Sequence, residues 1–369
     1  MHPGPLGREP GRECQRQHEC CPRPHRPPPA PLVPAPVGRP PLVYGARPPD
    51  SCAAEEGSAG RQGTAQVEAR VRPSVLLVGA ANLDVVAQAD RPQPGQSTPG
   101  RVRFGPGGAA RNVAENLARL GARTSLACAA GTDVLSDLVV RATEQAGVRV
   151  YARREAARPD VYVALTSAGE RLWAVSDLSA CEGLRPEDVV GFARECGPLD
   201  AVVADANLSG ATLAAAAALA PRLGLLAVSA AKAARLRPHL RGAWLLVCSA
   251  AEAEVLVGAP VDGPKAALDA ARRTIQEGCG TVVITLGPQG LVWAGQQTLY
   301  LPAPSVAAAD PTGAGDAVAA CAVYGLLRGT PPEELARLCV WAGALTVGVE
   351  GSTCTDLSWE VLRARAASC

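Results

Sequence analysis

From residue 74 onward the chain alternates short apolar runs with longer segments in which apolar residues recur every three or four positions. The apolar runs predict buried strands and the periodic segments predict helices. The predicted strands lie within residues 74–78, 124–130, 199–208, 223–229, 243–249 and 280–287. The predicted helices lie within 111–122, 133–147 and 264–278. Strands that alternate with helices indicate βαβ units, so we predict an α/β fold with a mostly parallel central sheet.

Two segments depart from this alternation. Residues 160–177 read as two strands of alternating polarity around a turn at 167–170, which predicts an antiparallel hairpin. Residues 96–108 are extended and interrupted by Pro and Gly, and we expect an irregular stretch there. Together, at about 96–106 and 158–177, the two segments predict a small β element, either an edge hairpin or a lid over a site.

The first 73 residues have a different composition. Their density of proline excludes helices and paired strands. We therefore expect residues 1–73 to form a Pro/Arg-rich disordered tail, with a cleaved targeting segment as the alternative. Residues 74–369 are expected to form one domain.

Composition limits the classes of partner. A formal net charge of +1 gives no reason to expect nucleic acid or a membrane surface as a partner. No run approaches the ~20 apolar residues of a membrane helix, so we expect a soluble, cytoplasmic protein, or a mitochondrial one if the tail is a targeting segment. The 13 cysteines are scattered without a C-x-x-C pair, which favours a reducing compartment and makes a zinc site improbable.

The sequence DPTGAGD, at residues 310–316, precedes a predicted helix. Gly313 and Gly315 free the backbone to turn several N–H groups toward one point, and the helix adds the positive end of its dipole. This predicts an anion-binding site beside Asp316, whose carboxylate could accept a proton. The alternative is that Asp316 only caps the helix.

Two further stretches carry polar residues near helix or strand ends. Gly107 and Gly108 precede a predicted helix that carries Asn112, whose amide can both donate and accept toward a diol. Asn82 and Asp84 follow the first strand directly. The glycines only weakly match a dinucleotide fingerprint because no strand is predicted before them, and no G-x-x-x-x-G-K-[ST] phosphate loop occurs.

The segments GGAARNVAENLARLG, at residues 107–121, and DPTGAGDAVAA, at 310–320, resemble the two signatures of the ribokinase, or PfkB-type, carbohydrate kinases. With ANLDVV, VVADANLS and AVSDLS, the chain is most similar to the pseudouridine kinases of that family over residues ~74 to 360. The resemblance implies a ribokinase-like three-layer fold with a small β-lid. It also implies ATP-dependent phosphorylation of the 5′-hydroxyl of a ribosyl substrate, with pseudouridine the expected substrate.

The resemblance also assigns roles around the reacting groups. Asp316 would be the general base, and the N–H groups of Gly313, Ala314 and Gly315 would hold the charge on the transferring phosphoryl group. The ribose hydroxyls would be bound by residues of three different segments. These are Asp84, Gly108 and Asn112. Asp177 would face the base of the nucleoside, unless it is a solvated turn acid.

For the nucleotide side, the resemblance implies that Thr285, Gly287 and Gly290 border ATP. Glu252 would help to place Mg²⁺ through water, and Asp310 would belong to a loop that binds a monovalent cation such as K⁺. It further implies a glycosidase acting on pseudouridine 5′-phosphate as a metabolic partner, and a homodimer joined through the lid as an option.

Two positions depart from the family pattern. Ser249 stands where relatives have an asparagine in an N-x-x-E motif, and LGLLAVSAAKAARL, at 223–236, lacks an acid found after a strand in relatives. Three alternatives stay open, and the departures motivate the second of them. The chain could be a kinase for another nucleoside or ribose, a catalytically weak or silent nucleoside-binding protein, or a scaffold acting through its Pro-rich tail.

Overall fold

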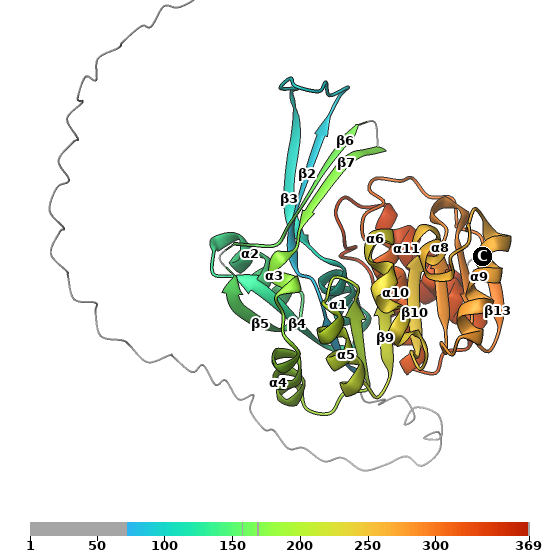
Figure 1. Ribbon diagram of the computed structural model, residues 1–369. Helices are drawn as coiled ribbons and strands as arrows, with labels where there is room; N and C mark the ends of the chain where they lie inside the picture. Colours follow the sequence, from blue (N-terminus) through green and yellow to red (C-terminus); the bar gives the residue numbers. More distant parts are fainter. Residues whose placement is uncertain (1–71, 157, 168–169, 368–369) are drawn as a thin grey trace, which may run out of the picture. The chain divides into compact units, whose positions relative to one another are not determined.

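A nine-stranded sheet forms the centre of the part of the chain that the computed structural model describes, residues 72–156, 158–167 and 170–367 (Figure 1). The strands run in the order β13-β12-β11-β10-β9-β8-β1-β4-β5. Their bounds are β1 (Ser74–Val78), β4 (Arg123–Gly131), β5 (Arg149–Ala156), β8 (Ala201–Asp205), β9 (Leu223–Leu226), β10 (Leu245–Ser249), β11 (Val282–Thr285), β12 (Leu291–Ala294) and β13 (Thr298–Leu301). Neighbours pair in parallel except β11–β12 and β12–β13. The predicted α/β fold is confirmed.

The expected tail, residues 1–73, falls outside the described residues, apart from its last two positions.

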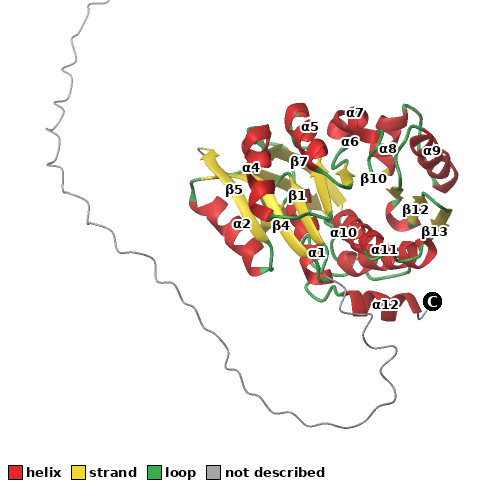
Figure 2. Cartoon of the chain, turned by 90° about the horizontal axis from the view of Figure 1, so that it is seen from below, coloured by secondary structure: helices red, strands yellow, loops and turns green. Residues whose placement is uncertain are grey.

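Helices cover both faces of this sheet (Figure 2). One layer holds α1 (Ala109–Leu120), α10 (Ala314–Leu327), α11 (Pro332–Val347) and α12 (Trp359–Ala367). The other holds α4 (Pro186–Cys196), α5 (Gly210–Leu219), α6 (Ala230–Ala233), α7 (Arg237–Leu240), α8 (Ala250–Val257) and α9 (Pro264–Gln276). The remaining helices are α2 (Val134–Gln145), near the β5 edge, and the short α3 (Ser179–Glu182).

The strand β1 shows why the central strands read as continuous apolar runs. Val75 and Leu77 are fully buried in the core shared with α1, α10 and α11. Leu76 and Val78 are fully buried in the core on the opposite face. Side chains alternate between the two faces of a strand, so a sheet with both faces covered requires an apolar residue at every position.

A second sheet of four strands, here called the lid, stands apart from the first (Figure 1). Its order is β3 (Gly100–Gly107), β2 (Asn82–Ala89), β6 (Val161–Ser167) and β7 (Glu170–Asp177). The predicted antiparallel hairpin is present as β6–β7. The expectation of an irregular stretch before α1 is wrong, because β3 pairs with β2 over eight residues and runs directly into that helix. The strand β2 was not predicted at all.

Within the described residues, no helix is long and apolar enough to cross a membrane. The eight cysteines in this part of the chain are free thiols. Seven of them are buried, as small apolar side chains in the two cores would be.

Asp160 fastens the base of the lid to the rest of the protein. Its carboxylate oxygens accept hydrogen bonds from the N–H groups of Ala180 (2.8 Å) and Cys181 (2.9 Å) in α3. Its carbonyl accepts one from the N–H of Leu83 in β2 (2.9 Å). Because Asp160 is 3% exposed, these donors replace the water that the carboxylate loses on folding.

We predict that Asp160→Ala lowers the free energy of unfolding by about 1–3 kcal/mol, since two buried N–H groups lose their acceptor. Urea unfolding followed by circular dichroism measures the change. Asp90→Ala, at an exposed acid beside the lid turn, is the matched control and should leave the midpoint unchanged. Equal midpoints for the two variants would show that Asp160 does not fasten the lid.

Candidate active site

A buried carboxylate holds together the loop after β1 and the start of α1. Asp205, the last residue of β8, accepts hydrogen bonds from the N–H groups of Ala80 (2.9 Å), Ala110 (3.3 Å) and Asn207 (2.9 Å). Burial raises the pKa of this carboxyl, and the three backbone donors lower it. Sequence reasoning missed Asp205, although its position at a strand end is the signal that selected Asp84.

The two glycines before α1 leave room for a backbone carbonyl at Gly108 and for a carboxylate at Gly107. Gly108 has φ of 103°, and a Cβ there would lie 2.4 Å from the carbonyl oxygen of Ala80. A Cβ at Gly107 would lie 2.2 Å from the carboxylate of Asp84. The missing side chains therefore let β2, β3 and the start of α1 converge, which brings Asp84 to the beginning of the helix.

The first and last signatures meet through a hydrogen bond. The side-chain amide nitrogen of Asn112, on α1, donates to Oδ2 of Asp316, in the first turn of α10, at 2.8 Å. Asn112 is 4% exposed and Asp316 is half-buried. Asp84 accepts a hydrogen bond from the amide of Asn82 (2.7 Å) and interacts electrostatically with Asp316. Residues more than 200 positions apart along the chain thus share one site.

The start of α10 has the form of an anion-binding turn. Gly313 caps the helix with φ of 79°, and a Cβ there would lie 1.9 Å from the carbonyl oxygen of Ser352. A Cβ at Gly315 would meet nothing within 4 Å, so the space beside it is open. The first N–H groups of a helix have no partner within the helix, and its dipole favours negative charge at this end.

Burial and neighbouring carboxylates give Asp316 an unusual pKa. Loss of hydration raises the pKa of this carboxyl to about 7; the Asn112 hydrogen bond lowers it, and the carboxylates of Asp205, Asp84 and Glu252 raise it. Burial also raises the pKa of Asp84 to about 6, against the Asn82 hydrogen bond and the positive charge of Arg111. A general base works best when its pKa lies near the operating pH, which Asp316 satisfies.

The nucleotide-side candidates lie at the ends of β10 and β11. Ser249 and Thr285 are paired in register as the last residues of these strands. Ser249 begins α8, and its hydroxyl accepts a hydrogen bond from the N–H of Glu252 (3.4 Å), while Oε2 of Glu252 accepts one from the N–H of Ser249 (2.7 Å). The backbone N–H of Ser249 therefore holds the carboxylate of Glu252, whereas the serine hydroxyl contacts only the backbone of Glu252.

The two glycines after β11 have different structural reasons. Gly290 has φ of 102°, and a Cβ there would lie 2.0 Å from the carbonyl oxygen of Leu301 in β13. Gly287 has φ of 57° and open space around it. Gly290 is therefore required by the fold of the strand end, whereas Gly287 leaves open space two residues after Thr285.

The donors available for metal ions differ at the two candidate positions. Among the described residues, no group of three or more His, Cys, Asp and Glu side chains could hold a metal by itself. Mg²⁺ usually binds one or two carboxylates together with substrate phosphates and water, so the half-buried carboxylate of Glu252 fits such a role. Both oxygens of Asp310 already accept hydrogen bonds, from the N–H of Thr312 (2.9 Å) and from Arg103 (3.3 Å). A monovalent cation there would share this carboxylate with Arg103.

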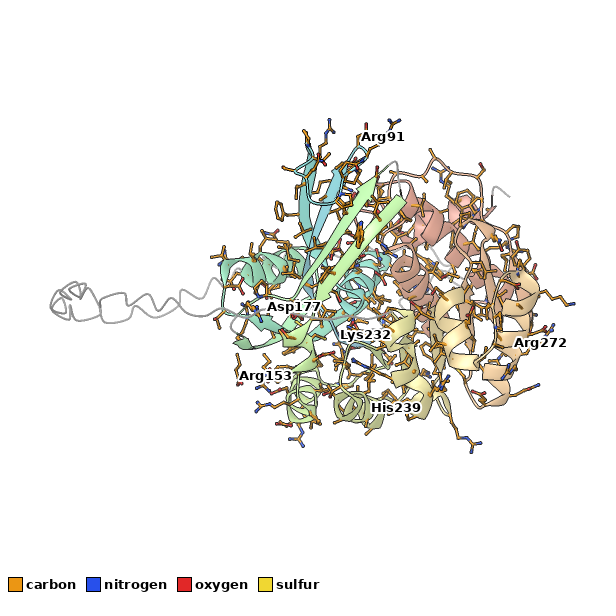
Figure 3. All side chains as sticks on the ribbon, turned by 45° about the horizontal axis from the view of Figure 1, so that its top comes forward. Arg91, Arg153, Asp177, Lys232, His239 and Arg272 are labelled. Atoms are coloured by element: carbon orange, nitrogen blue, oxygen red, sulfur yellow. The ribbon has the colours of Figure 1, made fainter. Side chains whose placement is uncertain are left out.

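Asp177 forms its hydrogen bond within its own turn and not with Asn112 or Asp316. It ends β7 where the lid joins the rest of the protein, whereas Arg91 marks the far end of the lid (Figure 3). Its exposed carboxylate accepts a hydrogen bond from the N–H of Ser179 (3.3 Å), which lowers its pKa. This contact is the one expected of a turn acid.

Sequence reasoning also missed Lys232, which follows β9 (Figure 3). Its ammonium group donates to the side-chain oxygen of Asn207 at 2.8 Å. It lies on the side where the family's strand-end acid is absent and places a positive charge there. Its signal in the sequence is only that it is one of two lysines.

Comparison with known proteins agrees with this fold. Residues 72–358 match the pfkB family carbohydrate kinases. The chain is 28% identical to the pseudouridine kinase of Escherichia coli K12, over 78% of this chain and 95% of that protein. It is 30% identical to the ribokinase of Mus musculus, over 68% of this chain and 81% of that protein.

The structure of a carbohydrate kinase from Agrobacterium tumefaciens superposes with a TM-score of 0.69 at 28% identity, covering 80% of this chain and 97% of that one. A ribokinase from Arabidopsis thaliana, in complex with ribose and ATP, shares the fold with a TM-score of 0.67 at 19% identity, covering 81% and 100%.

The fold and the converging signatures define a phosphotransferase that uses an alcohol group as acceptor. The chain belongs to the pfkB family of carbohydrate kinases, which confirms the resemblance seen in the sequence. Kinases of this family act on small sugars or nucleosides and use ATP with a divalent metal.

We predict that kcat/KM falls on the acid side with an apparent pKa near the value of about 7 expected for Asp316. Below that pH the carboxyl is protonated and cannot accept a proton, so the rate falls about tenfold per pH unit, whereas above it the rate is constant. Steady-state rates measured from pH 5 to 9 test this. An acid limb near pH 4 would mean that burial does not control the base.

Proposed function

We propose that this kinase transfers the γ-phosphoryl group of ATP to the 5′-hydroxyl of a ribosyl substrate, with pseudouridine as the preferred one. The observation that carries the proposal is the Asn112–Asp316 hydrogen bond, which joins a polar helix start to an acid at an anion-binding turn. The 28% identity to a pseudouridine kinase over most of the chain supports the choice of substrate.

In this reaction Asp316 accepts the proton of the 5′-hydroxyl. The 5′-oxygen forms a bond to the γ-phosphorus, the bond from that phosphorus to the β–γ bridging oxygen breaks, and ADP leaves. The N–H groups of Gly313, Ala314 and Gly315 donate to the oxygens of the transferring group. One such donor contributes ~10²–10³ in rate.

The ribose hydroxyls bind at the start of α1. Asp84 can accept hydrogen bonds from two vicinal hydroxyls, and it lies against Gly107 because that residue has no side chain. Asn112 and the backbone of Gly108 complete the set. Asp177 is the weakest member of the proposed site, since its carboxylate is occupied by its own turn.

ATP lies across the ends of β10 and β11, with Thr285, Gly287 and Gly290 at its border. Glu252 would help to hold Mg²⁺ through water, and the ion would neutralise phosphate charge when bound. Asp310, together with Arg103, forms the position for a monovalent cation. A glycosidase that acts on pseudouridine 5′-phosphate would use the 5′-phosphate product as its substrate.

The choice of substrate is tested by parallel kinetics on the full chain with Mg²⁺ and K⁺. Pseudouridine, uridine, adenosine, ribose and deoxyribose are each offered with ATP, and kcat/KM is compared. The highest value for pseudouridine supports the proposal. A higher value for another compound keeps the mechanism and replaces the substrate. Binding without turnover of any compound would favour the silent nucleoside-binding alternative.

We predict that Asp316→Asn lowers kcat by ~10²–10⁴, because an amide of the same shape cannot accept the proton. The affinities for ATP and nucleoside, measured by calorimetry, should stay within a few-fold. Asp262→Asn, at an exposed loop position before α9, is the control and should be fully active. An Asp316→Asn variant that keeps most of its activity would refute the assignment of the base.

We further propose that two copies of the chain associate through the outer face of the lid. In register, Phe104, Val85, Val163 and Val175 form one row across the four strands. Val102, Ala87, Leu165 and Trp173 form the adjacent row on the same face. Phe104 and Trp173 are 67% and 70% exposed, so a large apolar surface faces outward.

The opposite face of the lid turns toward the site, because Arg103 reaches Asp310 from it. A second copy is the occupant that this outer face fits, since it is uncharged and a two-fold axis would place the same apolar rows against each other. Association would leave the polar face of each lid free for substrate.

We predict that the wild-type chain is a dimer in light scattering at micromolar concentration and that Trp173→Asp is a monomer. Val134→Asp makes the same charge change at an exposed valine at the start of α2, outside the lid, and should remain a dimer. A monomeric wild type, or a dimeric Trp173→Asp variant, would contradict this interface.

A further inference from the structure

The side-chain amide of Asn112 lies between a positive and a negative group. Its nitrogen donates to Asp316 at 2.8 Å. Its oxygen accepts from a guanidinium nitrogen of Arg111 at 3.0 Å and from the hydroxyl of Ser352 at 3.2 Å. The amide therefore presents its donor to the negative carboxylate and its acceptor to the positive guanidinium.

Rotating the amide by 180° would reverse both contacts. The oxygen of Asn112 would then face the carboxylate of Asp316, and its NH₂ group would face the guanidinium of Arg111, which has no acceptor. Ser352 could rotate its hydroxyl and serve either orientation. Arg111 is therefore the group that forces the amide nitrogen toward Asp316.

Arg111 is itself rigidly held. It is 2% exposed, and it forms an ion pair with Glu115 one helical turn along α1. It also donates to the hydroxyl of Thr143 in α2 (3.3 Å) and to the carbonyl of Pro106 at the end of β3 (3.2 Å). These three contacts, from α1, α2 and β3, fix the direction of its guanidinium.

Glu115 is shared with a second arginine. Arg119 donates to its Oε1 at 2.7 and 3.1 Å, and the hydroxyl of Thr353 donates to the same oxygen at 3.0 Å. The trio of two arginines and one glutamate carries a net positive charge. Removing Arg111 leaves Glu115 still paired with Arg119, so no isolated buried charge results.

The charge of Arg111 faces the site carboxylates. It lowers the pKa of Asp84 and interacts favourably with Asp316. The charged groups with the largest effect on the pKa of Asp316 come from β8, β2 and α8, and they are the acids Asp205, Asp84 and Glu252. Arg111 thus opposes three carboxylates that disfavour the ionised form of Asp316.

We propose that Arg111 is a positioning residue for phosphoryl transfer: it fixes the Asn112 amide with its nitrogen toward Asp316 and so holds that carboxylate in the form that accepts the proton. This inference rests on the proposed role of Asp316 as the base. Arg111 touches neither substrate nor phosphate in this account.

The test is the titration of Asp316 in the full chain carrying Arg111→Met, a substitution that keeps length but removes charge and donors. Carbon-detected NMR follows the carboxyl, assigned by the signal lost in Asp316→Asn. Loss of a charge and of an oriented donor should raise the pKa of Asp316 by about 1 unit. The pH at which kcat begins to fall on the acid side should rise by the same amount. Below that pH, kcat should be about tenfold lower than in the wild type, and KM for ATP should stay within about twofold.

Two further variants separate positioning from stability. Arg119→Gln also loosens the trio but contacts neither Asn112 nor Asp316, so its titration and acid limb should match the wild type. Arg111→Lys keeps the charge but loses the contact at the amide. It should lower kcat in the wild-type chain and have no effect in an Asn112→Ala chain, because the amide through which it acts is gone.

An unchanged Asp316 titration in Arg111→Met, or an equal shift in Arg119→Gln, would overturn the proposal. If Arg111→Met does not fold, as judged by circular dichroism, the Arg111→Lys and Asn112→Ala cycle decides, and additive effects of these two changes count against it. If no ribosyl compound is phosphorylated, the proposed function fails, while the NMR titration still shows whether Arg111 controls Asp316.

Discussion

Like-charge crowding at the carboxyl edge of the sheet is the constraint around which this site is built. Asp84, Asp205 and Asp316 come from three separate segments and interact electrostatically in a region with little water. Each therefore needs its own donors. Backbone N–H groups serve Asp205, and the amides of Asn82 and Asn112 serve Asp84 and Asp316. The donors that make the crowding tolerable are also the contacts that assemble the site.

This crowding matches the chemistry of phosphoryl transfer. An acid that is ionised only near neutral pH can take a proton from an alcohol and release it again within a turnover. Positive charge lies on the flanks, at the amino end of α10, on buried Arg111 and on Lys232 beside Asn207. The departures from the family pattern fall at the ends of β9 and β10 and not in α1 or α10, and the carboxylate of Glu252 still accepts a hydrogen bond from the N–H of Ser249.

The sequence predicted those parts of the fold whose residues are buried on both faces. Strands such as β1 and β8 are continuous apolar runs because helices cover both sides. In the lid, β2 escaped prediction and β3 was expected only as an irregular part of a small β element, because each strand depends on the other for pairing and the apolar residues of one face alternate with Arg and Asp on the other. In β3, prolines and glycines lie around the alternating residues, so the segment reads as an irregular stretch.

The site was predictable where glycine and an acid mark a strand or helix end, as at Gly108 and Asp316. Arg111 and Glu115 were not, because an Arg–Glu pair one turn apart reads as an exposed helix pair. Only the packing of α1 against α10, and the hydrogen bonds of Arg111 to Pro106 and Thr143, show that this pair is buried. Asp205 was missed for a similar reason, since its role depends on backbone groups more than 90 residues away.

The position of the phosphate on the product tests the central claim most directly. Phosphorus NMR of the reaction of the full chain with ATP, Mg²⁺ and pseudouridine identifies the oxygen that is phosphorylated. The account predicts a 5′-phosphate ester formed together with ADP. Phosphate on another hydroxyl, or ADP formed with free phosphate and no ester, would contradict the placement of the 5′-hydroxyl beside Asp316.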